Sequence, residues 1–163
     1  MSVVRDPQSL SSRLARAQFR LSVRVYWEDT DAGGIVFYAN YLKFMERARS
    51  DWLRSLGLGQ ERLRTQGHGV FVVSETHVRY LRSARLDDEL VVTASLRERG
   101  RASLVFDQLV MCGEHVLCEG DIRVGWVQPD AQGQLRPARM PSTIAQALPA
   151  PWTESVPGET HGH

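Results

Sequence analysis

The feature that most constrains the fold is the order of hydrophobic periods along the chain. From Phe19 to Trp27, apolar and polar residues alternate, which predicts a half-buried strand. From Asn40 to Leu56 the period changes to that of an amphipathic helix, and Gly57 and Gly59 predict its end. The apolar stripe of this helix consists of Tyr41, Phe44, Met45, Ala48, Trp52 and Leu56.

Strand patterns dominate after this helix. Gln60 to Gln66 forms a short helical or irregular piece, and a last short helix begins at Ser142, after Pro141. The turn at Gly113 and Glu114 makes a hairpin that sets Cys112 opposite His115 or Val116. The four strands are expected at Val70 to Tyr80, Leu90 to Arg97, Ser103 to Cys112 and His115 to Gln128.

One long helix cannot cover both faces of a five-stranded sheet. The order of elements therefore predicts an α+β fold, in which an antiparallel five-stranded sheet curls around the helix. The other face and the edges of the sheet are then free for another subunit. We divide the chain into an N-terminal extension (1–18), one folded domain (19–148) and a disordered, proline-containing tail (149–163).

Charge and composition exclude several classes of partner. With 20 basic and 19 acidic residues the net charge is +1, which gives no electrostatic reason to expect nucleic acid. No apolar run is long enough to span a membrane, and the polar first 20 residues lack the apolar centre of a signal peptide. Two cysteines, Cys112 and Cys118, form no disulfide framework. We therefore expect a cytoplasmic protein.

The segment from Asp29 to Asn40, "DTDAGGIVFYAN", concentrates acids and glycines directly before the helix. An EF-hand is excluded, because the twelfth position is Asn40 instead of a bidentate glutamate. A phosphate-binding P-loop is excluded, because no Gly-Lys-Ser/Thr follows the glycines. The histidines and cysteines show no zinc-ligand spacing, so we expect no metal and no cofactor.

Two interpretations of the segment remain open. It is either a plain turn, since acid-glycine strings are common turn signals, or a catalytic loop. Gly33 and Gly34 would let a ligand approach the backbone, and the start of the next helix presents unpaired N–H groups. A carboxylate beside such an N-terminus suits acyl transfer, with Asp31 as nucleophile or general base and backbone N–H groups near Tyr38 as oxyanion donors.

The stretch "VYWEDTDAGGIVFYANYLKFMERARSDWL" resembles the signature of 4-hydroxybenzoyl-CoA thioesterase-like hotdog proteins, and more narrowly of Tol-Pal-associated acyl-CoA thioesterases. The similarity continues through "FVVSETHVRYLRSARLDDEL" and "RGRASLVF", and it spans roughly Leu21 to Pro141. It implies a hotdog fold, metal-free hydrolysis of an acyl-CoA thioester, and a homodimer or homotetramer with sites between subunits. A non-catalytic hotdog module that binds acyl-carrier protein or a cell-envelope partner is the alternative.

By position, the resemblance assigns the catalytic carboxylate to Asp31 and the carbonyl-polarising N–H to Tyr38. The Tol-Pal-associated branch commonly has histidine where this chain has Tyr38, so the resemblance does not decide which acyl group the protein would accept. Asn40 either binds substrate, caps the helix or orients the loop, and Glu46 either lies at the site or on a solvated helix face. The residues that we place around the substrate are Gly33, Gly34, Asn40, Glu46 and, as forks for the coenzyme A phosphates, Arg99 and Arg101.

Overall fold

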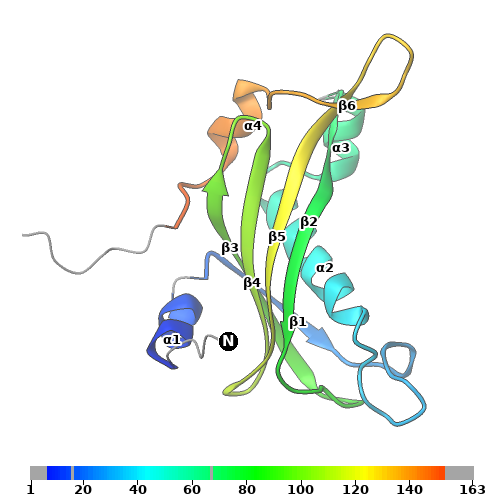
Figure 1. The fold of residues 1–163 in the computed structure, drawn as a ribbon, viewed down its shortest axis with the longest axis vertical. Helices are drawn as coiled ribbons and strands as arrows, with labels where there is room; N and C mark the ends of the chain where they lie inside the picture. The colour runs from blue at the N-terminus through cyan, green and yellow to red at the C-terminus, as the bar shows by residue number, and fades with distance from the viewer. Residues whose placement is uncertain (1–6, 16, 67, 153–163) are drawn as a thin grey trace, which may run out of the picture.

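The computed structural model describes residues 7–15, 17–66 and 68–152. Within these residues one antiparallel sheet of six strands runs the length of the molecule, in the order β1-β3-β4-β5-β2, and β6 pairs with the end of β5 (Figure 1). The strands are β1 (Phe19–Arg24), β2 (Val70–Tyr80), β3 (Glu89–Arg99), β4 (Ser103–Cys112), β5 (His115–Pro129) and β6 (Leu135–Pro137).

The long helix α2 (Asn40–Ser55) lies across one face of the sheet, which we call the inner face, against β1, β3 and β4. Phe44, Met45 and Ala48 on its apolar stripe are completely buried. Gly120 of β5 lies beneath the helix, and a Cβ atom there would be 3.0 Å from the Met45 sulfur. The missing side chain therefore lets the helix approach the sheet closely. The predicted hotdog architecture is confirmed.

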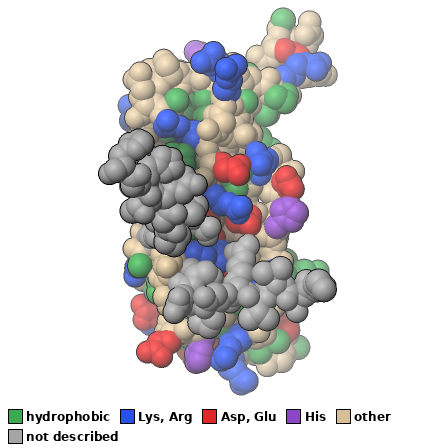
Figure 2. All heavy atoms as spheres, turned by 60° about the vertical axis from the view of Figure 1, so that its left-hand side comes forward, with side chains coloured by type: hydrophobic (Ala, Val, Ile, Leu, Met, Phe, Trp, Pro, Cys, Tyr) green, Lys and Arg blue, Asp and Glu red, His purple; other side chains and the backbone are tan. Residues whose placement is uncertain are grey.

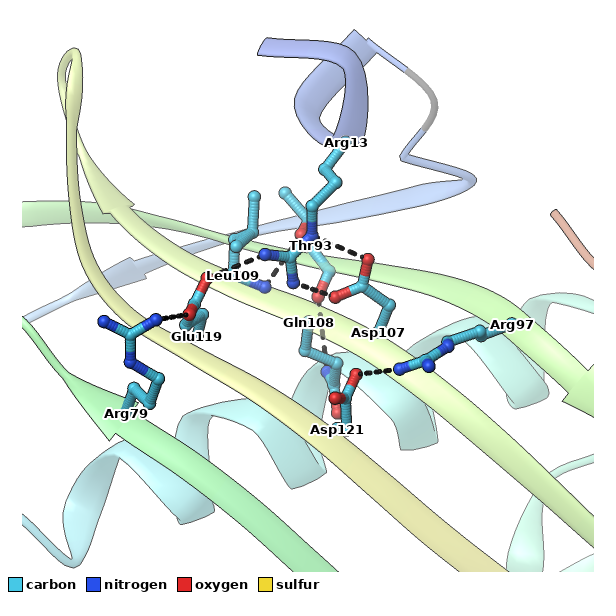
Figure 3. Close-up of polar contacts among 9 residues, drawn as sticks. All are labelled: Arg13, Arg79, Thr93, Arg97, Asp107, Gln108, Leu109, Glu119 and Asp121. Carbon is cyan, nitrogen blue, oxygen red and sulfur yellow. Dashed lines mark hydrogen bonds and ion pairs between the residues drawn. The ribbon is translucent and has the colours of Figure 1, made fainter. Parts of the chain in front are cut away.

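The opposite, outer face of the sheet carries the short helix α1 (Pro7–Ala15). Arg13 of this helix reaches down to Asp107 of β4 and Glu119 of β5, as Figure 3 shows. Basic and acidic side chains also lie interspersed on the side of the molecule drawn in Figure 2. The prediction that the outer face is free is wrong for β4, because Asp107 and Leu109 are only 8% and 1% exposed.

Several element boundaries match their predictions. α2 starts at Asn40, β2 and β4 have the predicted ends, and Cys112 lies opposite His115 in the hairpin. The predicted short helical pieces are α3 (Gln60–Gln66) and α4 (Ser142–Ala147). In the described part of the chain, no helix is long and apolar enough to cross a membrane.

Other predictions need correction. β1 ends at Arg24 instead of Trp27, because Trp27–Asp29 forms a 3₁₀ turn. The sheet of the described chain has six strands and not five. The predicted disordered tail is anchored where it is described, since Trp152 N–H donates to the Leu96 carbonyl at 2.6 Å. The rest of that tail, 153–163, lies outside the described residues.

Candidate active site

The loop between β1 and α2 folds into a tight turn. Thr30 and Val36 form an antiparallel bridge, and Asp31 N–H donates to the Ile35 carbonyl at 2.8 Å. Gly34 N–H donates to the Asp31 carbonyl at 3.0 Å, and Gly34 has a φ of 77°, a left-handed conformation that favours glycine. The acid-glycine string therefore does form a turn, and Asp31 stands at its first position.

The Asp31 side chain is exposed and oriented at the same time. Its Oδ1 accepts a hydrogen bond from Gly33 N–H at 2.8 Å, while its Oδ2 pairs with no described residue. A Cβ atom at Gly33 would lie 3.2 Å from Oδ1, which is tighter than an ordinary contact. Glycine at position 33 thus lets the backbone hold one carboxylate oxygen and leaves the other open to a reactant.

Asp29, the other acid of the turn, has a different environment. It is only 7% exposed, and its Oδ2 accepts a hydrogen bond from Tyr26 N–H at 2.9 Å. Its carbonyl accepts from Phe37 N–H at 3.0 Å and from Asn40 Nδ2 at 2.8 Å. Asp29 therefore holds the loop together, and its carboxylate faces the protein interior.

Two backbone N–H groups at the start of α2 have no acceptor among the described residues. The cap residue Ala39 offers no side-chain hydrogen bond, and the Asn40 side chain does not cap the helix. Among the described residues, none accepts a hydrogen bond from Tyr38 N–H or Ala39 N–H. These two donors stand at the positive end of a 16-residue helix, where a developing negative charge is stabilised.

Aromatic rings surround this helix start. The Phe37 and Tyr38 rings lie 4.8 Å apart, and the Tyr38 and Tyr80 rings lie 6.0 Å apart. All three are substantially exposed. Behind them, the Tyr41 hydroxyl accepts a hydrogen bond from Ala84 N–H, and burial raises its pKa, so it stays protonated at neutral pH. Tyr80 comes from β2, and no pattern in the sequence predicts its place beside the helix start.

Glu46 lies away from the turn. It projects from the exposed side of α2, where its Oε1 accepts a hydrogen bond from the Ser50 hydroxyl at 2.8 Å. It borders a cleft of about 890 Å³ between α2 and α3. Among the described residues, no group of histidine, cysteine, aspartate or glutamate side chains is arranged to hold a metal ion.

Arg99 and Arg101 lie at the far end of the sheet from Asp31. β3 begins at Glu89, beside the loop, and its 11 residues span roughly 33 Å before the turn that holds the arginines. There they line a cleft of about 930 Å³ together with Arg139, and Arg99 donates to the Ala145 carbonyl at 3.0 Å. One chain alone does not bring these arginines to Asp31.

Comparisons with known proteins identify the family of the chain. Residues 33–119, which begin two positions after Asp31, match the family model of the thioesterase superfamily. The chain is 37% identical over 130 residues to "Acyl-CoA thioesterase YbgC" of Haemophilus influenzae, which covers 80% of this chain and 93% of that protein.

Solved structures agree as well. A probable thioesterase from Bartonella henselae has a TM-score of 0.68 at 30% identity, covering 75% of this chain and 98% of the other. A 4-hydroxybenzoyl CoA thioesterase in complex with 4-hydroxybenzoyl CoA shares the fold with a TM-score of 0.72 at 20% identity, covering 81% and 98%. The chain thus belongs to the thioesterase superfamily and has its hotdog fold.

Proposed function

We propose that this protein hydrolyses the thioester bond of an acyl-CoA, with Asp31 as nucleophile or general base and the Tyr38 N–H as oxyanion donor. One observation carries the proposal. A single short loop presents both an exposed, oriented carboxylate oxygen and a helix-start N–H that no described residue uses. The names of the related proteins, acyl-CoA thioesterases among them, support the substrate class.

The proposed chemistry needs only these groups and water. The thioester carbonyl oxygen accepts the Tyr38 N–H, which stabilises the negative charge that develops on it. The Asp31 carboxylate either attacks the carbonyl carbon, giving an anhydride that water opens, or takes a proton from the attacking water. In both routes the carbon–sulfur bond breaks, and coenzyme A leaves as a thiol with a free acid as co-product.

The acyl group would lie over the turn and the first turn of α2. Gly34 leaves open space on its surface, since a Cβ there would meet nothing within 4 Å. We therefore propose Gly33 and Gly34 as residues around the substrate. Asn40 is only 8% exposed and its amide donates to the Asp29 carbonyl, so it would act on the loop and not on the substrate. Glu46 is a substrate contact only for a molecule that extends along α2 to its cleft.

Coenzyme A phosphates would bind at Arg99 and Arg101, and this assignment requires a second copy of the chain. β2 is an edge strand of the described sheet, and Val72 and Val73 on it are each 46% exposed. If two copies pair antiparallel along β2, the end of one sheet that carries Arg99 and Arg101 meets the end of the other sheet that carries Asp31. The arginine turn of one copy then lies at the same end as Asp31 of its neighbour. We propose a homodimer or a homotetramer of dimers.

The first experiment is a panel of short, aromatic and long acyl-CoAs, with an acyl-carrier-protein thioester beside them. We expect release of free thiol from at least one acyl-CoA, unaffected by EDTA. Tight binding without thiol release would favour the non-catalytic module instead. Light scattering on the active protein should find at least a dimer, and a fully active monomer would contradict the shared site.

The second experiment compares the two acids. Asp31→Asn keeps an oxygen for the Gly33 N–H but removes the charge, so turnover should fall by about 10²–10⁴-fold with KM little changed. Asp29→Asn is the matched control, because the amide oxygen can still accept from Tyr26 N–H. The assignment is wrong if Asp29→Asn abolishes turnover while Asp31→Asn does not.

A further inference from the structure

The two ends of the candidate catalytic loop are tied by a compact set of hydrogen bonds. The Asp29 carbonyl, on the way into the loop, accepts both Phe37 N–H and Asn40 Nδ2 on the way out. Asn40 N–H in turn donates to the Phe37 carbonyl at 2.9 Å, and the Asp29 carboxylate binds Tyr26 N–H. Asp31 and Tyr38 lie between these residues. The middle of the loop is also held by backbone hydrogen bonds, from Val36 N–H to the Ala84 carbonyl at 2.9 Å and from Leu86 N–H to the Gly34 carbonyl at 3.2 Å.

Asn40, the only asparagine of the chain, is the side chain that connects this base to a rigid element. It is the first residue of α2, and the next turn of that helix is fixed in the core by Phe44 and Met45, both completely buried. Its bond to Asp29 spans 11 positions of the sequence at 2.8 Å. This side-chain amide therefore connects the start of the helix to the first half of the loop, in addition to the backbone hydrogen bonds of the loop.

The structure argues against other duties for the Asn40 side chain. It does not cap α2, since the cap position is Ala39 and no side-chain cap bond forms. It is only 8% exposed, and its Nδ2 points to Asp29, so the amide donor faces inward. A buried amide of this kind affects the site through the backbone carbonyl to which it donates.

We propose that Asn40 is a positioning residue. Its amide fixes the Asp29 carbonyl, and through it the Phe37 peptide, so that the Tyr38 N–H and the Asp31 carboxylate are held in one geometry before substrate arrives. The expected change in turnover rests on the proposed thioesterase function. The hydrogen bond between the Asn40 amide and the Asp29 carbonyl can be tested without any substrate.

The decisive variant is Asn40→Asp, which is isosteric but turns a carboxylate oxygen toward the Asp29 carbonyl. A misplacement of about 1 Å can cost about 10²-fold in rate, so kcat should fall by about 10–100-fold while KM changes by less than about 2-fold. Gln18→Glu is the matched control. It also loses one side-chain donor to a backbone carbonyl, that of Ala150, at the other end of β1. Its kcat should stay near wild type.

A double-mutant cycle separates positioning from plain destabilisation. If Asn40 acts through Asp31, then Asn40→Asp should cost much less kcat in an Asp31→Asn background than in the wild type. Full additivity would overturn the proposal, because it would mean that Asn40 affects turnover by a route independent of Asp31. If Asn40→Asp folds poorly, the same double-mutant cycle can be measured with Asn40→Ala, for which we expect a smaller loss of kcat.

A substrate-free measurement makes the tie testable by itself. Amide hydrogen exchange at Phe37 should be slow in the wild type and at least about 10-fold faster in Asn40→Asp, because the Phe37 N–H shares its acceptor with Asn40. Unchanged Phe37 protection would refute the inference. If no acyl-CoA is hydrolysed but exchange at the Phe37 amide accelerates as expected, the thioesterase proposal fails, while the positioning of the loop backbone by Asn40 is supported.

Discussion

Arg13 offers the sharpest test of how the outer face of the sheet is held. Its side chain is 8% exposed and donates Nε and Nη2 to the two Asp107 oxygens and Nη1 to Glu119 at 2.7 Å (Figure 3). Burial alone would lower the pKa of Arg13, but the hydrogen bonds and charges of these carboxylates raise it overall. Arg13 is therefore charged at neutral pH.

Arg13→Ala removes the cation, and its two carboxylate partners then differ in the ion pairs that remain to them. Glu119 keeps its ion pair with Arg79 at 3.1 Å, whereas Asp107 is 8% exposed and its described ion pair is with Arg13 alone. Breaking a buried pair from one side costs about 3–5 kcal/mol, and the remaining Arg79 favours the lower value, about 3 kcal/mol. For a chain of this length that corresponds to a fall in Tm of about 6–12 °C.

The assay is thermal unfolding followed by circular dichroism, with Arg97→Ala as the control. Arg97 also pairs with a carboxylate of the central strands, Asp121 at 3.0 Å, but its side chain is 45% exposed. An exposed pair contributes about 0–1 kcal/mol, so this variant should lose at most about 4 °C. Equal shifts for Arg13→Ala and Arg97→Ala would refute the reasoning. Adding Asp107→Ala to Arg13→Ala should recover part of the loss, since the buried Asp107 carboxylate is then removed while Glu119 keeps its ion pair with Arg79.

Two further predictions concern the core. Gly69→Ala would put a Cβ atom 2.5 Å from Trp126 Cζ2 and 2.6 Å from the Val127 carbonyl oxygen, so we expect a loss of about 1–3 kcal/mol in the free energy of urea unfolding; an unchanged midpoint would contradict this. Burial raises the pKa of Cys118 from 9.0 to about 12, so the thiol should resist iodoacetamide at pH 8 in the folded protein. The unfolded thiol ionises first, so stability should fall between pH 9.0 and about 12, and Cys118→Ala should flatten that fall.

Elements with a strong period could be predicted from the sequence to the residue. The change from period two to the helical stripe gives the start of α2 at Asn40, and the turn signal in "CGEH" gives the end of β4 at Cys112. In both cases the local pattern and the tertiary burial agree. The hairpin register, with Cys112 opposite His115, follows because a short turn leaves little freedom.

Elements held by tertiary contacts could not be predicted. α1 has the sequence PQSLSSRLA, which carries no clear apolar stripe, and its anchor is the ion pair of Arg13 with residues 94 and 106 positions away. β6 has three residues and ends in Pro137, so it has neither length nor alternation. Trp27 fits the strand period of the sequence, but the chain leaves the sheet there to form the 3₁₀ turn.

The candidate site was only partly predictable for a similar reason. Asp31 and the glycines are adjacent in sequence, so the acid-glycine string alone identifies their turn. Tyr80, by contrast, reaches the helix start only because the edge strand β2 ends beside it in the folded sheet. Arg99 and Arg101 lie at the end of the sheet opposite to Asp31, and no pattern in the sequence predicts how two copies of the chain would pair.

Under the proposed mechanism the loop needs two acids, because its two tasks are incompatible in one side chain. Holding the base requires a carboxylate that is buried and already hydrogen-bonded, as Asp29 is with Tyr26 N–H. Attacking a thioester, or activating water, requires an oxygen that is exposed and has no other partner, as Asp31 Oδ2 has none among the described residues. Burial would remove the access that the chemistry needs, and exposure would weaken the bonds that fix the Tyr38 N–H. The pattern Asp-Thr-Asp places Asp29 at the last residue of the 3₁₀ turn and Asp31 at the first position of the following turn, so the two carboxylates have different environments.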